Sequence, residues 1–331
     1  MKYINLISIL LMLVFGIYPL QAQQFAPVGT AVAQFLEIGV GARATAMGEA
    51  YTAMTDDAGS SFWNPAGLAN VQERNLYLAY TSWPADIAIG GVSLGWNLGS
   101  AGVVGVNAVY LNTDDMPVTT VYDPEGTSGQ MFKISNYAFG LSYARFMTDN
   151  LAVGATAKIV TEDYFGYGYN TFALDLGTVY NTGFNGLKLA MSILHFGPEV
   201  KFSGSYIDYS DPASVARNEK RDFESYSLPI TFRFGLAMDI INDESSRLVS
   251  AFDMVHPNNN LEEYNLGLEY GFRKMFFVRG GYKFQVDEGG LTLGLGIKYD
   301  ISDEYGVNVD YAYSDMGVLP TVHRLSLGFD F

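Results

Sequence analysis

Four short patterns in the sequence carry residue types that can do chemistry. Residues 91–95 (Gly-Val-Ser-Leu-Gly) have the spacing of a nucleophile elbow, in which a serine on a strand-to-helix turn attacks an acyl carbon. Residues 39–44 (Gly-x-Gly-x-x-Ala) have the spacing of a dinucleotide-binding turn, in which glycines admit a pyrophosphate. The acidic pairs at 56–57 and 114–115 offer the oxygen ligands that Ca²⁺ prefers. The elements around each pattern decide its meaning.

The surrounding sequence argues against catalysis and cofactor binding at these patterns. No helical pattern follows Ser93, and no strand–helix–strand unit follows residue 44. Acidic pairs in loops are more often solvated residues or helix caps. The three histidines, His195, His256 and His323, lie far apart and lack the spacing of zinc ligands. We therefore predict a protein that is not an enzyme and holds no cofactor or metal, and keep a hydrolase that uses Ser93 as an alternative.

The 331-residue chain is poor in charged residues. It has 19 Lys and Arg against 35 Asp and Glu, or 16% of all residues, whereas soluble domains carry ~25%. Because 49% of the residues are apolar and 15% are aromatic, a disordered polar chain is excluded. The net charge of −16 disfavours nucleic acid as a ligand, since phosphates are neutralised by Lys and Arg. The absence of Cys excludes disulfides, thiolate catalysis and a Cys-linked lipid anchor.

Residues 1–22 have the features of a secretory signal peptide. Lys2 gives the positive start, an apolar run extends from Ile4 to Leu20, and Ala22 offers a small residue at the cleavage site. A retained membrane anchor is the alternative interpretation. We expect Sec-dependent export with cleavage near Ala22.

The rest of the chain alternates apolar residues with small or polar ones, at the two-residue period of β-strands. Between residues 291 and 299, Leu, Ile and Tyr fill the odd positions, and Thr, Gly and Lys fill the even ones. The uncharged stretch 87–113 has the hydropathy of a membrane helix, but it is rich in glycine and alternates on both sides of a turn at 97–100. Export, strands of about 10 residues and aromatic strand ends together predict an all-β protein, a transmembrane antiparallel up-and-down β-barrel.

Fourteen strands are expected. Because the number is even, the first strand starts and the last strand ends on the same side of the membrane, the periplasmic side. They lie near residues 76–83, 87–98, 101–111, 131–146, 151–163, 169–180, 187–195, 228–240, 246–256, 262–272, 275–285, 290–300, 304–314 and 322–331. The long connections, about 112–135 and 196–227, then fall on the outer side. On the other face of the strands the side chains are small, polar or charged, as at Lys158 and Asp175. This face predicts a polar lumen without an apolar pocket.

Residues 23–75 are the part of the sequence least like a barrel. They are rich in small residues, Asp56 or Asp57 is placed to cap a short helix that runs towards Trp63, and Pro65 is placed to end it. Such a compact segment suits a plug in the mouth of a barrel. The chain therefore divides into a signal peptide at 1–22, a hatch or plug at 23–75 and a barrel at 76–331.

The same segment resembles the N-terminal signature of the PorV/PorQ family of outer-membrane proteins, which is similar to the FadL fatty-acid transporters. The resemblance rests on residues 39–43, 47–48, 56–58 and 63–68, and Asn-Pro-Ala at 64–66 matches the FadL hatch. It implies a fourteen-stranded barrel with an N-terminal hatch, whose motif residues have a structural or gating role. These residues are Gly39, Gly41, Arg43, Gly48, Asp56, Asp57, Trp63, Asn64, Pro65, Ala66 and Gly67. The C-terminal residues Leu325, Leu327, Phe329 and Phe331 look like the recognition signal of the barrel-assembly machinery.

The resemblance implies a part in type IX protein secretion in Bacteroidetes-like bacteria, in which the outer loops bind exported cargo or secretion components. We expect the long charged loop at 196–227 to dock a protein partner, and the aromatic tip at 164–169 to join the membrane girdle or to contact a partner. The alternative is FadL-like passive transport of fatty acids or other hydrophobic small molecules. Both roles predict a location in the bacterial outer membrane, with lipid around the barrel.

Overall fold

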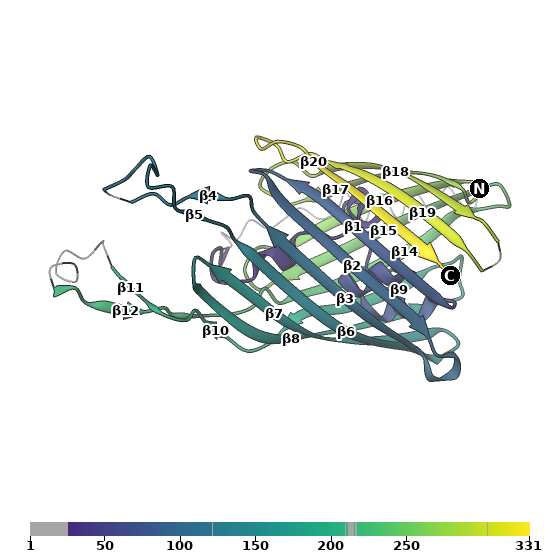
Figure 1. The fold of residues 1–331 in the computed structure, drawn as a ribbon. Coiled ribbons are helices and arrows are strands. Elements are labelled where there is room, and N and C mark those ends of the chain that lie inside the picture. The colour runs from purple at the N-terminus through teal and green to yellow at the C-terminus, as the bar shows by residue number, and fades with distance from the viewer. Residues whose placement is uncertain (1–25, 121, 209, 211–214, 216, 303) are drawn as a thin grey trace.

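The computed structural model describes residues 26–120, 122–208, 210, 215, 217–302 and 304–331. Its main body is a closed antiparallel barrel of fourteen strands, which confirms the predicted fold (Figure 1). The barrel strands are β1 (Arg74–Trp83), β2 (Ile87–Asn97), β3 (Val103–Asn112), β6 (Ser135–Thr148), β7 (Leu151–Tyr164), β8 (Tyr167–Asn181), β9 (Lys188–Phe196), β14 (Thr231–Asn242), β15 (Ser246–Pro257), β16 (Glu263–Phe272), β17 (Phe276–Phe284), β18 (Leu291–Asp300), β19 (Gly306–Ser314) and β20 (Val322–Asp330). The expected signal peptide at 1–22 lies outside the described residues.

The barrel closes between its first and last strands. β1 pairs with β20 in a register that runs from Asn75 opposite Asp330 to Ser82 opposite His323. Each other barrel strand pairs with its neighbours in chain order. A closed wall leaves no strand edge, so its backbone groups are paired within the sheet, which is the condition for crossing a bilayer with strands.

The two faces of the wall differ as the alternation predicts. Along β18, Leu293 and Leu295 point outward and are 49% and 58% exposed, whereas Thr292 is buried and its hydroxyl donates to the Ala46 carbonyl inside the barrel (3.1 Å). The predicted lumen residues Lys158 and Asp175 are likewise buried. An apolar outer surface suits lipid, because a Lys or Arg at the bilayer midplane costs ~2–4 kcal/mol.

The two ends of the barrel are unequal. At the turn end, where β1 starts and β20 stops, connections are short and one contains the 3₁₀ helix η4 (Gly99–Ala101). At the other end, which we call the arm end, the described residues of 113–134 form a first arm and those of 197–230 a second arm, and both arms project beyond the barrel (Figure 1). The arms contain short ladders that the sequence did not predict: β4 (Met116–Pro117) with β5 (Met131–Phe132), β10 (Val200–Lys201) with β13 (Ser225–Tyr226), and β11 (Ser205–Ile207) with β12 (Lys220–Asp222).

Aromatic rings attach the second arm to the β7–β8 hairpin. Phe202 of the arm lies edge-on to Tyr169 and to Tyr164, with ring centroids 5.0 and 5.8 Å apart. The Ser203 N–H donates to the carbonyl of Gly168 (2.9 Å). The aromatic tip at 164–169 therefore supports the arm, a contact that the sequence could not distinguish from a membrane girdle.

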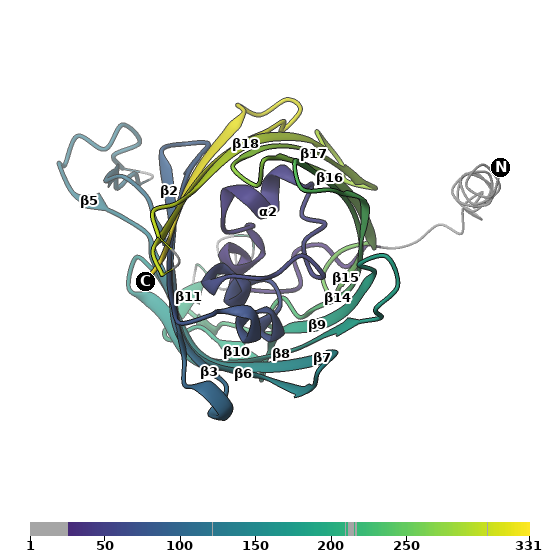
Figure 2. The same cartoon turned by 90° about the vertical axis from the view of Figure 1, so that its right-hand side faces the viewer.

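The segment before β1 lies inside the ring of strands, where Figure 2 shows it as purple turns. It contains η1 (Gln34–Glu37), α2 (Ala42–Ala46), η2 (Ala58–Phe62) and η3 (Pro65–Asn70). Within the described ranges, no helix has the length and apolar character needed to cross a bilayer. We refer to residues 26–73 as the hatch.

Local capping shapes the second half of the hatch. Asp57 precedes η2, and its N–H donates to Ser60 Oγ (3.2 Å). The prediction that Pro65 ends the short helix running towards Trp63 is wrong, because η2 already stops at Phe62 and Pro65 begins η3. Proline suits the first position of a helix, since its φ is already helical and its missing N–H is not needed there. Asn64 caps η3 by accepting the Ala66 N–H at Oδ1 (3.1 Å).

The main core of the protein lies between the hatch and the wall. Small inward residues such as Ala138, Ala152 and Ala173 are fully buried there, in one cluster with Trp63 and Met47 of the hatch. A wall lined by small side chains leaves the barrel wide enough to hold the hatch. The interior is thus packed rather than an open pore.

Candidate functional site: the hatch and the cavities beside it

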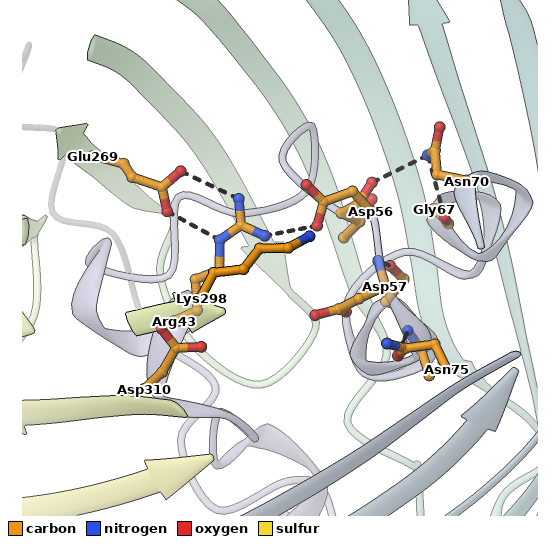
Figure 3. Close-up of polar contacts among 12 residues, drawn as sticks. Arg43, Asp56, Asp57, Gly67, Asn70, Asn75, Glu269, Lys298 and Asp310 are labelled. Carbon is orange, nitrogen blue, oxygen red and sulfur yellow. Dashed lines mark hydrogen bonds and ion pairs between the residues drawn. The ribbon is translucent and has the colours of Figure 1, made fainter. Parts of the chain in front are cut away.

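A chain of ion pairs joins the hatch to the wall (Figure 3). Arg43 of α2 donates through Nε and Nη2 to the two carboxylate oxygens of Glu269 on β16 (3.0 and 3.2 Å), and through Nη1 to Asp56 Oδ1 (2.6 Å). Glu269 also accepts from Arg279 Nε on β17 (2.6 Å), and Arg279 Nη1 donates to Asp310 on β19 (2.6 Å). The Glu269 carboxylate therefore lies between two guanidinium groups. Bidentate pairs of this kind add geometric specificity, so α2 is held in one position.

A second ionic group lies nearer the arm end. Glu49 of the hatch pairs with Lys283 Nζ on β17 (3.2 Å), and Arg233 Nη2 on β14 lies 3.7 Å from its carboxylate. Burial alone would raise the pKa of Glu49, but Lys283 and Arg233 hold that pKa below its ordinary value. Glu49 is therefore an anion that the wall retains.

The wall also captures the hatch backbone. On β15, Asp253 Oδ2 accepts the N–H groups of Tyr51 (3.2 Å) and Thr52 (3.0 Å) and the Thr52 hydroxyl (2.5 Å). From the hatch side, Asn64 Nδ2 donates to the carbonyls of Thr52 (3.0 Å) and Thr178 on β8 (3.1 Å). These hydrogen bonds pair backbone N–H and C=O groups of the hatch that lie outside its helices and would otherwise be buried without a partner.

Trp63 links the two halves of the hatch and touches the wall. Its indole N–H donates to the Val40 carbonyl (2.8 Å), and its own carbonyl accepts from Ser192 Oγ on β9 (3.1 Å). The Arg233 guanidinium lies 5.0 Å from the centre of the Trp63 ring, in cation–π contact. Trp63 therefore contacts both halves of the hatch and the wall.

Glycines allow close contact between hatch and wall. Gly48 has φ +64°, and its backbone lies against Gly281 of β17 so closely that a Cβ on Gly281 would overlap the Gly48 nitrogen. The Gly48 N–H donates to Thr292 Oγ1 (2.9 Å). The two backbones are in direct contact, so neither position has room for a side chain while the hatch stays in place.

The other motif residues are packing positions. A side chain at Gly39 would meet Trp63, one at Gly41 would overlap the Tyr77 hydroxyl, and one at Gly67 would overlap Thr55. Pro65 and Ala66 lie against Gly154 of β7. The structure thus brings Arg43 and Asp56 together, and it distributes the remaining motif residues over the contact between hatch and wall.

Asp57 is the motif residue whose charge is least well accommodated. Its Oδ1 is buried and has no hydrogen-bond partner among the residues that the structure describes. Burial, with a contribution from neighbouring Asp56 against that of Arg43, raises the pKa of Asp57 to about 7. The carboxyl is therefore largely protonated in mildly acid solution.

This raised pKa makes the stability of the hatch depend on pH. The pKa of the Asp57 carboxyl is higher in the folded protein than in the unfolded chain, where it is near 4, so its contribution to stability is complete below pH ~4. That contribution is lost as the pH rises through the folded pKa of about 7. We expect wild-type stability to fall by about 3 kcal/mol more than that of Asp57→Asn between pH 5 and 8. Denaturant unfolding at both pH values measures this, with Asp149→Asn in an exposed turn as control. Equal pH dependence in wild type and Asp57→Asn would contradict the assignment.

Two cavities lie at the arm end, on either side of the hatch segment that contains η1. The smaller, of about 230 Å³, is lined mainly by polar groups that include Lys158, His195 and Arg233. The larger, of about 600 Å³, is lined in part by Phe35 and Leu111. Further apolar residues of the larger cavity are Ile38, Trp83, Ile87, Ile134, Val286 and Met316. Both cavities are bordered by Gln34, Glu37, Ile38, Gly39, Glu49 and Lys283.

The larger cavity corrects the prediction of a lumen without an apolar pocket. Its apolar lining comes from the hatch residue Phe35 and from strand ends such as Trp83 and Ile87. The alternation of apolar and polar residues predicts which side chains face the lumen in the middle of the wall, but not at the strand ends or in the hatch. No sequence pattern therefore indicates this cavity or the contacts of Glu269 and Asp253 with the hatch.

Ser93 of the nucleophile-elbow pattern and the three histidines are engaged in polar contacts with neighbouring side chains. Ser93 is fully buried and accepts a hydrogen bond from hatch Ser61 Oγ (3.1 Å). His195 Nδ1 lies 3.4 Å from Lys158 Nζ, His256 pairs with Glu262, and His323 bonds Tyr311. Among the described residues, no three His, Cys, Asp or Glu side chains gather in a way that would hold a metal ion.

The C-terminal residues lie on the outside of β20 and just after it. Leu325 is 46% exposed and Phe331 is 37% exposed, while Leu327 and Phe329 are half-buried. The Phe331 N–H donates to the Arg74 carbonyl on β1 (3.0 Å). The end of the chain thus lies where the barrel closes, and its part in assembly stays a prediction.

Solved structures of channel and transporter proteins have a fold similar to that of this chain. The chain is similar to the CymD monoaromatic hydrocarbon channel, with 15% identity and a TM-score of 0.60 over 89% of this chain and 98% of that one. It is also similar to the Ralstonia pickettii toluene transporter TbuX (11%, TM-score 0.57, 88% and 97%) and to a Pseudomonas aeruginosa FadL homologue (11%, TM-score 0.56, 89% and 99%). Because these identities are low, the similarity establishes the FadL-like barrel fold alone.

At the sequence level, residues 20–181 match a family described as UPF0164, an uncharacterised protein family. No curated protein sequence matches the chain. The resemblance to the PorV/PorQ family stays a prediction.

Proposed function

We propose that this protein is an outer-membrane barrel through which small hydrophobic molecules pass, entering from the arm end and moving past the hatch. The observation that carries the proposal is the cavity of about 600 Å³ that lies beside the hatch and is lined by Phe35, Trp83 and Leu111. Ligand sites are typically concave and largely apolar, with a few polar groups that fix orientation. The apolar outer wall and the expected signal peptide at 1–22 support an outer-membrane location.

The structural relatives support the same role, because two of them are described as a monoaromatic hydrocarbon channel and a toluene transporter. No catalytic step is part of the proposal. The alternative that the sequence raised, passive transport of hydrophobic molecules, therefore becomes the leading function.

Uptake of toluene by intact cells tests this function, because the lipopolysaccharide outer leaflet slows the entry of hydrophobic molecules that a phospholipid bilayer lets through. Leu111→Trp fills part of the larger cavity and is expected to lower the initial rate by roughly tenfold, the effect of ~1.4 kcal/mol. Leu268→Trp is the matched control, because Leu268 points outward and is 46% exposed. Equal uptake by cells without the barrel, by cells with the wild type and by cells with either variant would rule the function out.

The two arms favour a second candidate, binding of exported proteins or of type IX secretion components. Both arms project beyond the wall, and the second is braced by the ring contacts of Phe202. This role predicts that such proteins copurify with the barrel from native membranes, and that deletion of residues 204–224 abolishes the association. A barrel isolated from native membranes without any partner would argue against it.

A further inference from the structure

The start of η1 is a weakly built part of the hatch. The helix has only four residues, Gln34–Glu37, and a helix of about one turn does not hold itself together. The residue before it, Ala33, has φ +55° and ψ +35°, in the left-handed region that residues with a side chain rarely adopt. Such a backbone persists only where surrounding contacts fix it. The contacts that fix residues 31–33 therefore decide where η1 lies.

Glu162 on β7 supplies one of these contacts. Its carboxylate is buried, and Oε2 accepts the Ala33 N–H (3.0 Å) and the Tyr169 hydroxyl (2.7 Å). Oε1 accepts the Tyr164 hydroxyl (3.0 Å) and Asn136 Nδ2 (3.1 Å). One carboxylate thus joins the strained residue of the hatch to two tyrosines at the arm end of the wall.

The second arm rests on the same two tyrosines. Phe202, in the first leg of the arm, lies edge-on to Tyr169 and to Tyr164, with interplanar angles of 78° and 63°. Aromatic pairs in this geometry are stabilising beyond the area that they bury. The first leg is therefore connected to Ala33 through two rings, their hydroxyls and the Glu162 carboxylate.

The second leg of the arm contacts the hatch directly. Ala31 forms a parallel bridge with Ser227, and the Val32 N–H donates to the Ser227 carbonyl (3.0 Å). The next residue of the leg, Leu228, is fully buried in the main core, in the cluster that also contains Ala33. The arm thus holds the start of the hatch at two points.

The two legs are paired with each other close to the barrel. Lys201 of β10 lies opposite Ser225 of β13. Phe202 follows Lys201 directly, and Ser227 lies two residues after Ser225. Because the ladder joins the legs, a displacement of the arm acts on both of its contacts with the hatch at once.

η1 forms part of the partition between the two cavities. Both cavities are lined by Gln34, Glu37 and Ile38. At the end of the helix, Glu37 Oε2 accepts from Asn259 Nδ2 in the connection between β15 and β16 (3.0 Å). The start of η1 therefore depends on the arm, while its end is attached to the wall.

We infer that the second arm is a strap that holds the start of η1 in place, and that displacement of the arm releases residues 31–36 and joins the two cavities. The released segment pivots about Glu37. Once the bond to Glu162 is broken, Ala33 can leave its left-handed conformation, so release also relieves backbone strain. The inference goes beyond the proposed function, because it concerns the coupling of an outer arm to the hatch and does not depend on what the barrel transports.

Phe202→Ala tests the strap, because it removes both ring contacts and leaves every residue of the hatch unchanged. Hydrogen exchange is followed by NMR on the full barrel in lipid nanodiscs, at the hydrogen-bonded amides of Val32, Ala33 and Leu36. We expect exchange at these three amides to become roughly tenfold faster, since two aromatic pairs are lost and local opening becomes easier.

Phe132→Ala is the matched control. Phe132 of the first arm packs edge-on against Phe165 at the tip of the same hairpin, with ring centroids 5.3 Å apart. This variant removes the same kind of contact without changing the tyrosines that bond to Glu162, so the three hatch amides should exchange at the wild-type rate. Unchanged exchange in Phe202→Ala, or an equal increase in Phe132→Ala, would overturn the inference.

Two amides farther along the hatch show whether the release is local. The Gly48 N–H bonds to Thr292 (2.9 Å) and the Thr52 N–H bonds to Asp253 (3.0 Å), both on the wall. Their exchange should be unchanged in Phe202→Ala. Equally faster exchange at these amides would mean that the hatch loosens as a whole, which contradicts a strap on η1.

The double variant Tyr164→Phe with Tyr169→Phe tests the path through Glu162. It keeps both rings for Phe202 but removes the two hydroxyls that orient the carboxylate. Exchange at the three amides should rise by a similar factor, and addition of Phe202→Ala should bring little further increase, because both changes act through one carboxylate. Fully additive effects would show that Phe202 acts by another route and would overturn the coupling through Glu162.

Uptake of toluene by cells separates the strap from the transport function. Release of η1 should make uptake severalfold faster in cells with Phe202→Ala than in cells with Phe132→Ala. Faster amide exchange without faster uptake would overturn the part of the inference that joins the cavities. If cells with the wild type take up no more toluene than cells without the barrel, the transport function fails, and the exchange measurement still decides whether the arm holds η1.

Discussion

Glu269→Gln is expected to lower the free energy of hatch opening by about 3 kcal/mol, the lower end of the cost of breaking a buried ion pair. The change removes the negative charge between Arg43 and Arg279 while keeping the size of the side chain. Two guanidinium groups then face each other across a neutral amide, and each keeps a single carboxylate partner, Asp56 for Arg43 and Asp310 for Arg279. Burial of charge that is only partly paired is unfavourable. The hatch should separate from the β16–β17 wall before the barrel itself unfolds.

Native-state hydrogen exchange measures this effect through the amides of hatch residues 42–70, whose protection reports local opening. Glu304→Gln, on an exposed turn, is the matched control and should leave protection unchanged. The double variant Arg43→Met with Glu269→Gln is expected to recover part of the loss, because it removes one of the two opposed charges. Full protection in Glu269→Gln would mean that the ion-pair chain does not hold the hatch.

Gly281→Val is expected to displace the hatch by steric conflict. A Cβ at this position would overlap the backbone of Met47 and Gly48, and overpacking a buried site costs ~1–3 kcal/mol or more. Since the wall strand is fixed by its neighbours, the hatch is the part that moves. We expect a measurable increase in the permeability of the barrel to a polar solute.

The neighbouring glycine gives an unusually close control. At Gly280, a Cβ would meet Leu293 Cδ2 at 3.6 Å and the Thr292 carbonyl oxygen at 4.0 Å, which are ordinary contact distances. Gly280→Val adds the same side chain to the same strand and should leave permeability unchanged. Swelling of liposomes that contain each variant compares the two, and equal permeability would show that the Gly48–Gly281 contact does not seal the barrel.

Local sequence patterns were sufficient to predict the strands of the wall and the two faces of each strand. The two-residue period that places Leu293 and Leu295 on one face and Thr292 on the other is a property of consecutive residues, so it is readable without knowing the fold. The number of strands and the side on which long connections fall followed from the same period. The short ladders of the arms were missed, because segments of two or three residues are too short to show any period.

The hatch was predictable as a segment but not as a set of contacts. The motif at 39–67 marked Arg43 and Asp56 as residues of interest, yet Glu269, the principal partner of Arg43, is 226 positions away. Asp253, which binds the backbone of residues 51 and 52, looked like any other inward-facing acid. Pairing across such distances depends on barrel closure and register, which no local pattern specifies.

The sequence by itself therefore determined a charge-poor, lipid-facing wall of fourteen strands and a small-residue segment able to fill it. Only the tertiary structure decided that Glu49 is held by the wall cations, and that Phe35 meets Trp83 and Leu111 around a cavity of about 600 Å³. The physical reason is that alternation assigns each wall residue to a face, whereas a cavity forms where the hatch leaves space beside residues from distant strands.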